Sequence, residues 1–172
     1  FGVRFDRSSK ELVIPLRDGE GKLWNVQRIA PTKPERGTDK LFIRGAKKSG
    51  LCHLIGQVQA PGALLVAEGY ATCASLHQAT GLPVAVAFDA GNLVHVAKAL
   101  HRQYPGALLV LCADNDAATE ARTGTNPGLQ KAMDAAGAVG GVVACPPRQE
   151  GQNVDFNDLH QAQGVEAVAT IV

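Results

Sequence analysis

Acidic residues follow three separate apolar segments of this 172-residue sequence, and one of these segments ends in two aspartates with i, i+2 spacing. Carboxylate oxygens are the ligands that Mg²⁺ and Mn²⁺ prefer, whereas zinc sites usually contain Cys or His. If the apolar segments are parallel strands, their carboxyl ends form one edge of a sheet, where α/β proteins bind ligands. The sequence therefore predicts a divalent-metal site built from five carboxylates. They are Glu68, Asp114, Asp116, Asp155 and Asp158.

The mutual repulsion of these carboxylates favours a functional role. Two carboxylates about 4 Å apart repel each other by roughly 4 kcal/mol at an effective dielectric constant near ~20. Lys and Arg are sparse after residue 60, so a fold that gathers these acids needs a cation or shared protons. The alternative is that the acids are solvated loop residues and helix N-caps, which are positions that Asp often occupies.

The elements that must position these acids follow a regular alternation. After Pro61, short apolar segments alternate with helical segments, which predicts an α/β, Rossmann-like domain with a four-stranded, mostly parallel sheet. Asn92 is expected to be a helix N-cap, and Pro127 is expected at the first position of a helix. The expected strands are 63–67, 83–88, 107–113 and 142–145, and the expected helices are 70–80, 92–103, 127–136 and 163–172.

The first sixty residues have a different pattern. The apolar segments 12–16 and 23–29 flank a stretch rich in turn-forming residues, which predicts a β-hairpin. A basic, glycine-bounded loop is expected at 45–50, and Pro61 marks a boundary. We therefore expect two units, a small β-rich subdomain at 1–60 and a catalytic domain at 61–172.

Charge divides along the same boundary. The formal net charge of the whole chain is +1, but residues 1–60 carry twelve Lys and Arg against six Asp and Glu, giving +6. Residues 61–172 carry five Lys and Arg against ten Asp and Glu, giving −5. This asymmetry predicts a basic half that holds nucleic-acid phosphates and an acidic half that holds metal. The alternative is that the basic residues form an ordinary solvated face.

Several classes of protein are disfavoured by composition. No apolar stretch reaches the roughly 18 residues of a membrane-spanning helix, and the start has no signal-peptide pattern. The four cysteines form no C-x-x-C pair and suit a reducing cytosol. We expect a cytoplasmic protein without a membrane partner. Because Phe1 is not an initiator methionine, we expect a piece of a longer protein.

The ordered acidic motifs resemble the Toprim domain, which bacterial primases share with topoisomerases and some nucleases. Residues 67–70, Ala-Glu-Gly-Tyr, are similar to the first motif in its primase form, and 113–116, Ala-Asp-Asn-Asp, to the second. Residues 155–159 resemble the final acidic motif of plasmid- and phage-type primases, and Asn-Pro-Gly at 126–128 is typical of the same branch. The N-terminal hairpin resembles the small subdomain that precedes Toprim in primases.

This resemblance implies a DNA primase core that joins ribonucleoside triphosphates on a single-stranded DNA template with Mg²⁺ or Mn²⁺. Glu68, Asp114 and Asp116 would be catalytic, and all five acids would be metal ligands. Zinc-binding or helicase domains of the same longer chain are expected partners. Six residues are expected to hold template or nucleotide phosphates. They are Arg28, Arg44, Lys47, Lys48, Gly91 and Asn92.

Two other functions remain open from the sequence. One is a Toprim nuclease with the same metal site, although the basic hairpin unit favours a primase. The other is a catalytically silent nucleic-acid-binding module of a larger plasmid or phage protein. Thr72 slightly favours the silent module, because the replicative primases carry an acid at this position. Thr72→Asp is expected to be tolerated in a primase.

Overall fold

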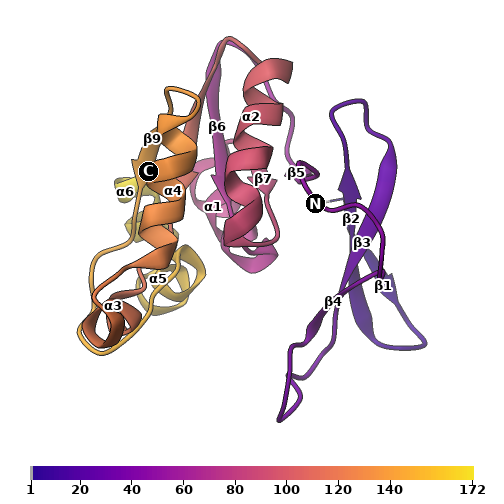
Figure 1. Cartoon of the computed structure of the whole chain (residues 1–172), viewed down its shortest axis with the longest axis horizontal. Helices are drawn as coiled ribbons and strands as arrows, with labels where there is room; N and C mark the ends of the chain where they lie inside the picture. Colours follow the sequence, from indigo (N-terminus) through magenta and orange to yellow (C-terminus); the bar gives the residue numbers. More distant parts are fainter. Residues whose placement is uncertain (1) are drawn as a thin grey trace.

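The computed structural model describes residues 2–172 and contains two β-sheets (Figure 1). The first sheet is antiparallel, with strand order β1-β2-β3-β4, and the second is mixed, with order β5-β7-β6-β8-β9. The first sheet packs beyond the β5 edge of the second, where Arg17 and Cys52 form a β-bridge. No helix of residues 2–172 is long and apolar enough to cross a membrane.

In the N-terminal sheet, the central strand β2 is a mostly apolar run in which burial alternates from Ile14 to Leu16, while the neighbouring strand β3 buries the polar residues Asn25 and Gln27. The predicted hairpin is confirmed, since β2 pairs with β3 in the register Leu12 to Ile29. Ile14 and Leu16 point to the same face and are fully buried against the rest of the molecule. The strands are β1 (Arg4–Asp6), β2 (Glu11–Arg17), β3 (Leu23–Ile29) and β4 (Lys40–Phe42).

The second sheet contains the four predicted parallel strands, in the order β7-β6-β8-β9. A fifth strand, β5, pairs antiparallel with β7 and was not predicted. It lies before residue 60, so part of the predicted N-terminal unit completes the second sheet, while the domain division at residue 60 stays a prediction. The strands are β5 (His53–Ile55), β6 (Gly62–Ala67), β7 (Val84–Val86), β8 (Ala107–Cys112) and β9 (Val142–Ala144).

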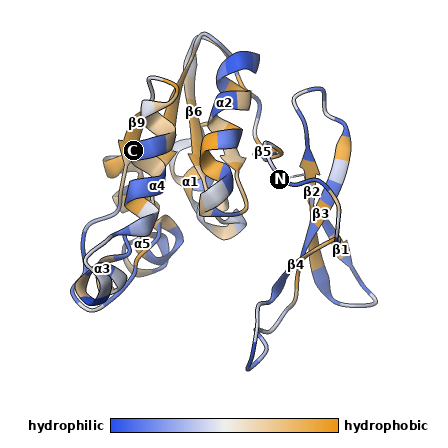
Figure 2. Ribbon diagram, in the orientation of Figure 1, coloured by the Kyte–Doolittle hydropathy of each residue, from blue (hydrophilic) through white to orange (hydrophobic). Residues whose placement is uncertain are grey.

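Helices cover both faces of the second sheet, which explains why its strands are apolar runs without alternation (Figure 2). One face packs against α1, α5 and α6, and the other against α2 and α4 (Figure 1). The helices are α1 (Tyr70–Thr80), α2 (Leu93–Gln103), α3 (Ala117–Thr123), α4 (Pro127–Gly137), α5 (Phe156–Gln163) and α6 (Val165–Ile171), and a 3₁₀ turn, η1 (Ala90–Asn92), precedes α2.

Two helices were not among the expected ones. Helix α3 lies between the expected strand 107–113 and the expected helix 127–136, and α5 begins within the Asp155–Asp158 cluster. Both are short, with seven and eight residues, so neither presents a long apolar period in the sequence. They matter for function because each begins directly beside one of the predicted acidic residues.

Candidate metal and phosphate site

Three of the predicted acids are brought together by strand pairing. Glu68 follows β6 and Asp114 follows β8, and these strands are parallel neighbours, so both acids leave the sheet at the same edge. Asp155 is placed there by a β-bridge between Asn115 and Val154, whose backbone groups exchange two hydrogen bonds of 2.8 and 2.9 Å. The bridge connects positions 39 residues apart, and the sequence alone gave no sign of it.

Asp114 lies at the centre of this arrangement. Burial, the charge of Glu68 and then the charges of Asp155 and Asp116 raise its pKa to about 7. Its Oδ1 atom is buried and accepts no hydrogen bond from any group of residues 2–172. A buried carboxylate oxygen without a donor is costly, and a proton or a hard cation can relieve that cost. The oxygen-only surroundings therefore fit Mg²⁺ or Mn²⁺.

The pKa of Glu68 is also shifted by the neighbouring acids. Burial raises its pKa, the charge of Asp89 raises it next, and Asp116 and Asp155 add to the effect, while Lys40 opposes it. Asp89 was not among the predicted site residues. It follows β7 as Glu68 follows β6, so the strand-end pattern could have identified it. Lys40 carried no comparable sequence signal.

Asp116 is oriented by the start of helix α4. Its Oδ2 accepts a hydrogen bond of 2.8 Å from the backbone N–H of Gly128, where the helix dipole favours a carboxylate. A Cβ atom at Gly128 would lie 2.6 Å from the Asp114 carbonyl oxygen, so only glycine allows this approach. The Asn126 side chain caps the helix by accepting from Leu129 N–H at 3.2 Å. The Asn-Pro-Gly motif therefore has a physical role in holding Asp116.

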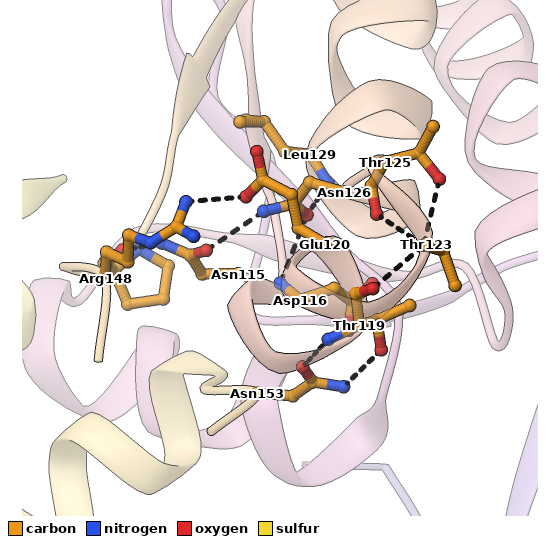
Figure 3. A network of polar contacts seen from close by, with 11 residues as sticks. Asn115, Asp116, Thr119, Glu120, Thr123, Thr125, Asn126, Leu129, Arg148 and Asn153 are labelled. Atoms are coloured by element: carbon orange, nitrogen blue, oxygen red, sulfur yellow. Dashed lines mark hydrogen bonds and ion pairs between the residues drawn. The ribbon is translucent and has the colours of Figure 1, made fainter. Parts of the chain in front are cut away.

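Figure 3 shows how the surrounding polar network fixes these segments. Asn126 also accepts from the Asp116 N–H at 3.1 Å and donates to Asn115 Oδ1 at 3.0 Å. Asn153 exchanges two hydrogen bonds with Thr119, which ties α3 to the segment that leads into Asp155. The network explains why α3 is ordered next to the acids. Arg148 and Glu120 add an ion pair of 2.7 Å.

Asp155 and Asp158 form the capping box of α5. Asp155 accepts from the Asp158 N–H at 2.8 Å, and Asp158 accepts from the Asp155 N–H at 3.0 Å. The alternative interpretation of these residues as helix caps is therefore correct for their local structure. Asp155 also acts electrostatically on Asp114 and Glu68, so it belongs to the cluster. Asp158 is not among the charges that shift either pKa, and its role as a metal ligand stays a prediction.

Thr72 is buried and donates a hydrogen bond of 2.8 Å from its hydroxyl to Asp155 Oδ2. An aspartate at this position would place a second buried carboxylate against Asp155 and remove the donor. We therefore expect Thr72→Asp to destabilise the fold rather than to be tolerated.

Within residues 2–172, no three His, Cys, Asp or Glu side chains form a ready-made group of metal ligands.

The predicted phosphate-binding residues lie in different places. Arg28 is paired with Glu11 on the N-terminal sheet, with 2.6 Å between Arg28 Nε and Glu11 Oε2. Lys48 forms an ion pair with Asp89 and so lies at the acidic edge. Lys47 lies over the Trp24 ring instead, with its Nζ 4.9 Å from the ring centroid. Arg44 and Gly91 are exposed, and their phosphate contacts stay predictions.

Asn92 occupies the N-cap position of α2 as predicted, but its side chain does not cap the helix. The buried amide instead donates to Leu51 O at 3.1 Å and Ala87 O at 2.8 Å, and it accepts from Gly50 N–H at 2.8 Å. The backbone N–H of Asn92 donates to Asp89 Oδ1 at 3.0 Å, so this group is already used within the protein. Asn92 therefore fastens the basic loop to the edge of the sheet.

Neutralising Asp114 is expected to stabilise the metal-free protein near neutral pH. Its folded pKa lies above the ordinary value of 3.8, so between these two values the folded state keeps a proton that the unfolded state has lost. The free energy of unfolding therefore falls as pH rises through this window, by up to about 4 kcal/mol for this one group. Asp114→Asn removes this loss, so it should stabilise the protein at pH 8 and change little at pH 4.

Urea unfolding of the wild type and Asp114→Asn in EDTA at both pH values measures this difference. Glu166→Gln, which neutralises an exposed acid on α6, is the matched control. A stability gain of equal size at pH 4 and pH 8 would show that the gain does not come from the raised pKa of Asp114.

Comparison with known proteins identifies the family. Residues 63–166 match the Toprim domain family. Two proteins from Escherichia coli, each named DNA primase TraC, are 39% and 40% identical to the chain over 161 residues, or 92% of its length. The chain spans only 15% and 11% of the length of these two relatives.

Solved structures show the same fold. The primase fragment of the bacteriophage T7 primase-helicase protein has a TM-score of 0.68 and 17% identity, covering 99% of this chain and 65% of that one. The DnaG primase catalytic domain bound to single-stranded DNA has a TM-score of 0.62 and 19% identity, covering 98% and 54%. The predicted fold and family resemblance are thus confirmed, and the chain belongs to the Toprim domain family, in the form found in plasmid-type DNA primases.

Proposed function

We propose that this chain is the catalytic core of a primase that joins ribonucleoside triphosphates on a single-stranded DNA template. The observation that supports this most strongly is Asp114, whose buried Oδ1 lacks a donor and whose pKa is raised by burial and by the three neighbouring acids Glu68, Asp155 and Asp116. The similarity to DNA primases over 92% of the chain supports the same reaction class.

Glu68, Asp114 and Asp116 are the proposed ligands of a divalent cation, Mg²⁺ or Mn²⁺, with Asp155 as a further acid of the same cluster. When bound, the cation supplies neutralisation of the triphosphate and of the charge that develops on the attacking and leaving oxygens. The hydrogen bond from Gly128 holds the Asp116 carboxylate, and the Oδ1 atom of the partly buried Asp114 is enclosed, before any ligand arrives.

Glu68 is also the proposed general base. In the metal-free protein, burial and the charge of Asp89 raise the pKa of Glu68, and a bound cation would oppose this shift, so the proposed role rests on the position of Glu68 at the strand end beside Asp114. Lys48 is the proposed triphosphate contact. It is paired with Asp89 in the protein, and an incoming triphosphate would compete for its charge.

The chain spans 15% of the first of its TraC relatives, so further domains are part of the proposal. We propose that the parent protein is cytoplasmic and carries zinc-binding or helicase domains that present the template. The T7 structure named above is itself a fragment of a primase-helicase protein.

Primer synthesis is tested with end-labelled single-stranded DNA and labelled ribonucleotides, with Mg²⁺ or Mn²⁺, using this chain and its longer parent protein. We expect short labelled RNA products and uncut template from the parent protein. Shortened template without RNA would instead establish the nuclease alternative. If the parent protein shows neither activity, the chain is a silent binding module and the proposed function is wrong.

A further inference from the structure

Two buried hydroxyl groups on α1 face the start of α5. Thr72 and Ser75 are three residues apart, a spacing that places both side chains on one face of the helix, and they are only 2% and 3% exposed. A buried hydroxyl costs free energy unless it is hydrogen-bonded. Thr72 Oγ1 donates to Asp155 Oδ2 at 2.8 Å, and Ser75 Oγ donates to Asn157 Oδ1 at 3.1 Å. Helix α1 thus contacts α5 through polar groups as well as through the shared apolar core.

The two hydroxyls hold different kinds of group. Ser75 holds the body of α5, because besides Asn157 it contacts His160, whose Nδ1 lies 2.9 Å from the Ser75 hydroxyl. Neither of these partners is an acid of the cluster. Thr72 instead contacts the carboxylate of Asp155. Since Ser75 already anchors the helix, the Thr72 bond bears on the orientation of that carboxylate.

Both oxygens of the Asp155 carboxylate have a donor. Oδ1 accepts from the Asp158 N–H at 2.8 Å, and Oδ2 accepts from the Thr72 hydroxyl. Donors on both oxygens fix the rotation of the carboxylate, and each oxygen keeps a further lone pair for a cation. Asp114 differs, because its buried Oδ1 has no donor among residues 2–172. Asp155 is therefore oriented by the protein itself, as hydrogen bonds orient the carboxylates of metal sites.

Of the two donors, Thr72 is the one that relates Asp155 to another acid. The bond from Asp158 belongs to the capping box of α5, so it orients Asp155 relative to its own helix. Thr72 is 83 residues away from Asp155 and lies in the first turn of α1, which begins two residues after Glu68. Its hydroxyl therefore fixes Asp155 relative to the strand end that carries Glu68. The charge of Asp155 acts on both Glu68 and Asp114, in agreement with this placement.

We propose that Thr72 is a positioning residue of the cation site, and that its hydroxyl holds Asp155 where the charge of this acid reaches Glu68 and Asp114. The inference rests on the proposed function and extends it from the acids to a neutral group that supports one of them. The replicative primases that the motifs resemble carry an acid at this position, so this chain has a hydrogen-bond donor in place of a charge. Loss of the donor should weaken cation binding although residue 72 is not a ligand.

The test is calorimetric titration of the EDTA-treated protein with Mn²⁺. Thr72→Val keeps the branched shape but removes the donor, so the dissociation constant should rise by roughly 10–100-fold, the usual cost of losing a supporting group. Thr72→Ser keeps the hydroxyl and loses a methyl group, so it should retain nearly the wild-type affinity. The matched control is Thr80→Val, the same change at the last residue of α1, where the hydroxyl donates to Leu76 O at 2.7 Å. Its Mn²⁺ affinity should equal that of the wild type.

A double-mutant cycle with Asp155→Asn separates positioning from a merely structural role. Asparagine keeps the N-cap of α5 and removes the charge that Thr72 orients. If Thr72 acts through Asp155, Thr72→Val should weaken Mn²⁺ binding in the wild-type background and have little further effect in the Asp155→Asn background. If the valine variant does not fold, Thr72→Ala and Thr72→Ser are compared in the same two backgrounds.

The inference and the proposed function fail in different ways. If the wild type binds Mn²⁺ and Thr72→Val binds it equally well, Thr72 does not position the site, while the proposed function stands. The same holds if Thr72→Ser or Thr80→Val loses as much affinity as Thr72→Val, or if the loss is undiminished in the Asp155→Asn background. A wild type that binds no Mn²⁺ overturns both the inference and the proposed function.

Discussion

Glu68→Gln is expected to reduce ribonucleotide joining by the parent protein by roughly 10²–10⁴-fold, which is the usual contribution of a positioned acid–base group. Glutamine keeps the shape of the side chain but cannot accept the proton or carry the negative charge. The substitution also relieves repulsion from Asp89, Asp116 and Asp155, so the fold should not be weakened. Single-turnover incorporation of labelled ribonucleotide measures the loss.

The matched control is Glu166→Gln, which makes the same chemical change on the exposed surface of α6. Its incorporation rate should equal that of the wild type, and Glu68→Gln should have a melting temperature no lower than that of the wild type. Near-normal incorporation by Glu68→Gln would show that Glu68 is structural and that the proposed mechanism is wrong.

The sequence predicted the parts of the site that local patterns control. Apolar runs that end in an acid indicated both the strands and the positions of Glu68 and Asp114, because parallel strands place their carboxyl ends at one edge. Pro127 marked the start of α4 correctly. These signals are read from a few neighbouring residues and need no knowledge of distant contacts.

Other parts of the site depend on partners far away in the sequence. The side chain of Asn92 bonds to residues about forty positions earlier in the chain, which makes it a buried link instead of a helix cap. Asp155 reaches the cluster through the bridge at Asn115, and β5 is a three-residue edge strand with too short a pattern to detect. Asp158 illustrates a different limit, because one Asp-x-x-Asp spacing suits both a capping box and a metal motif.

Asp114→Asn/Asp116→Asn is expected to remove the binding of divalent cations. These two carboxylates lie at the centre of the acidic cluster, and Asp114 supplies the oxygen that has no donor. Loss of a supporting group around a metal typically costs 10–100-fold in affinity, so loss of two direct ligands should exceed roughly 100-fold. The control variant Asp134→Asn/Glu166→Gln neutralises two exposed acids outside the cluster and should bind divalent cations as tightly as the wild type does.

The central claim is that these acids bind a divalent cation, and calorimetric titration of the EDTA-treated protein with Mn²⁺ tests it most directly. The predicted result is saturable binding by the wild type and by the Asp134/Glu166 control, with little or no binding by the Asp114/Asp116 variant. Indistinguishable titrations of the Asp114/Asp116 variant and the wild type would contradict the claim.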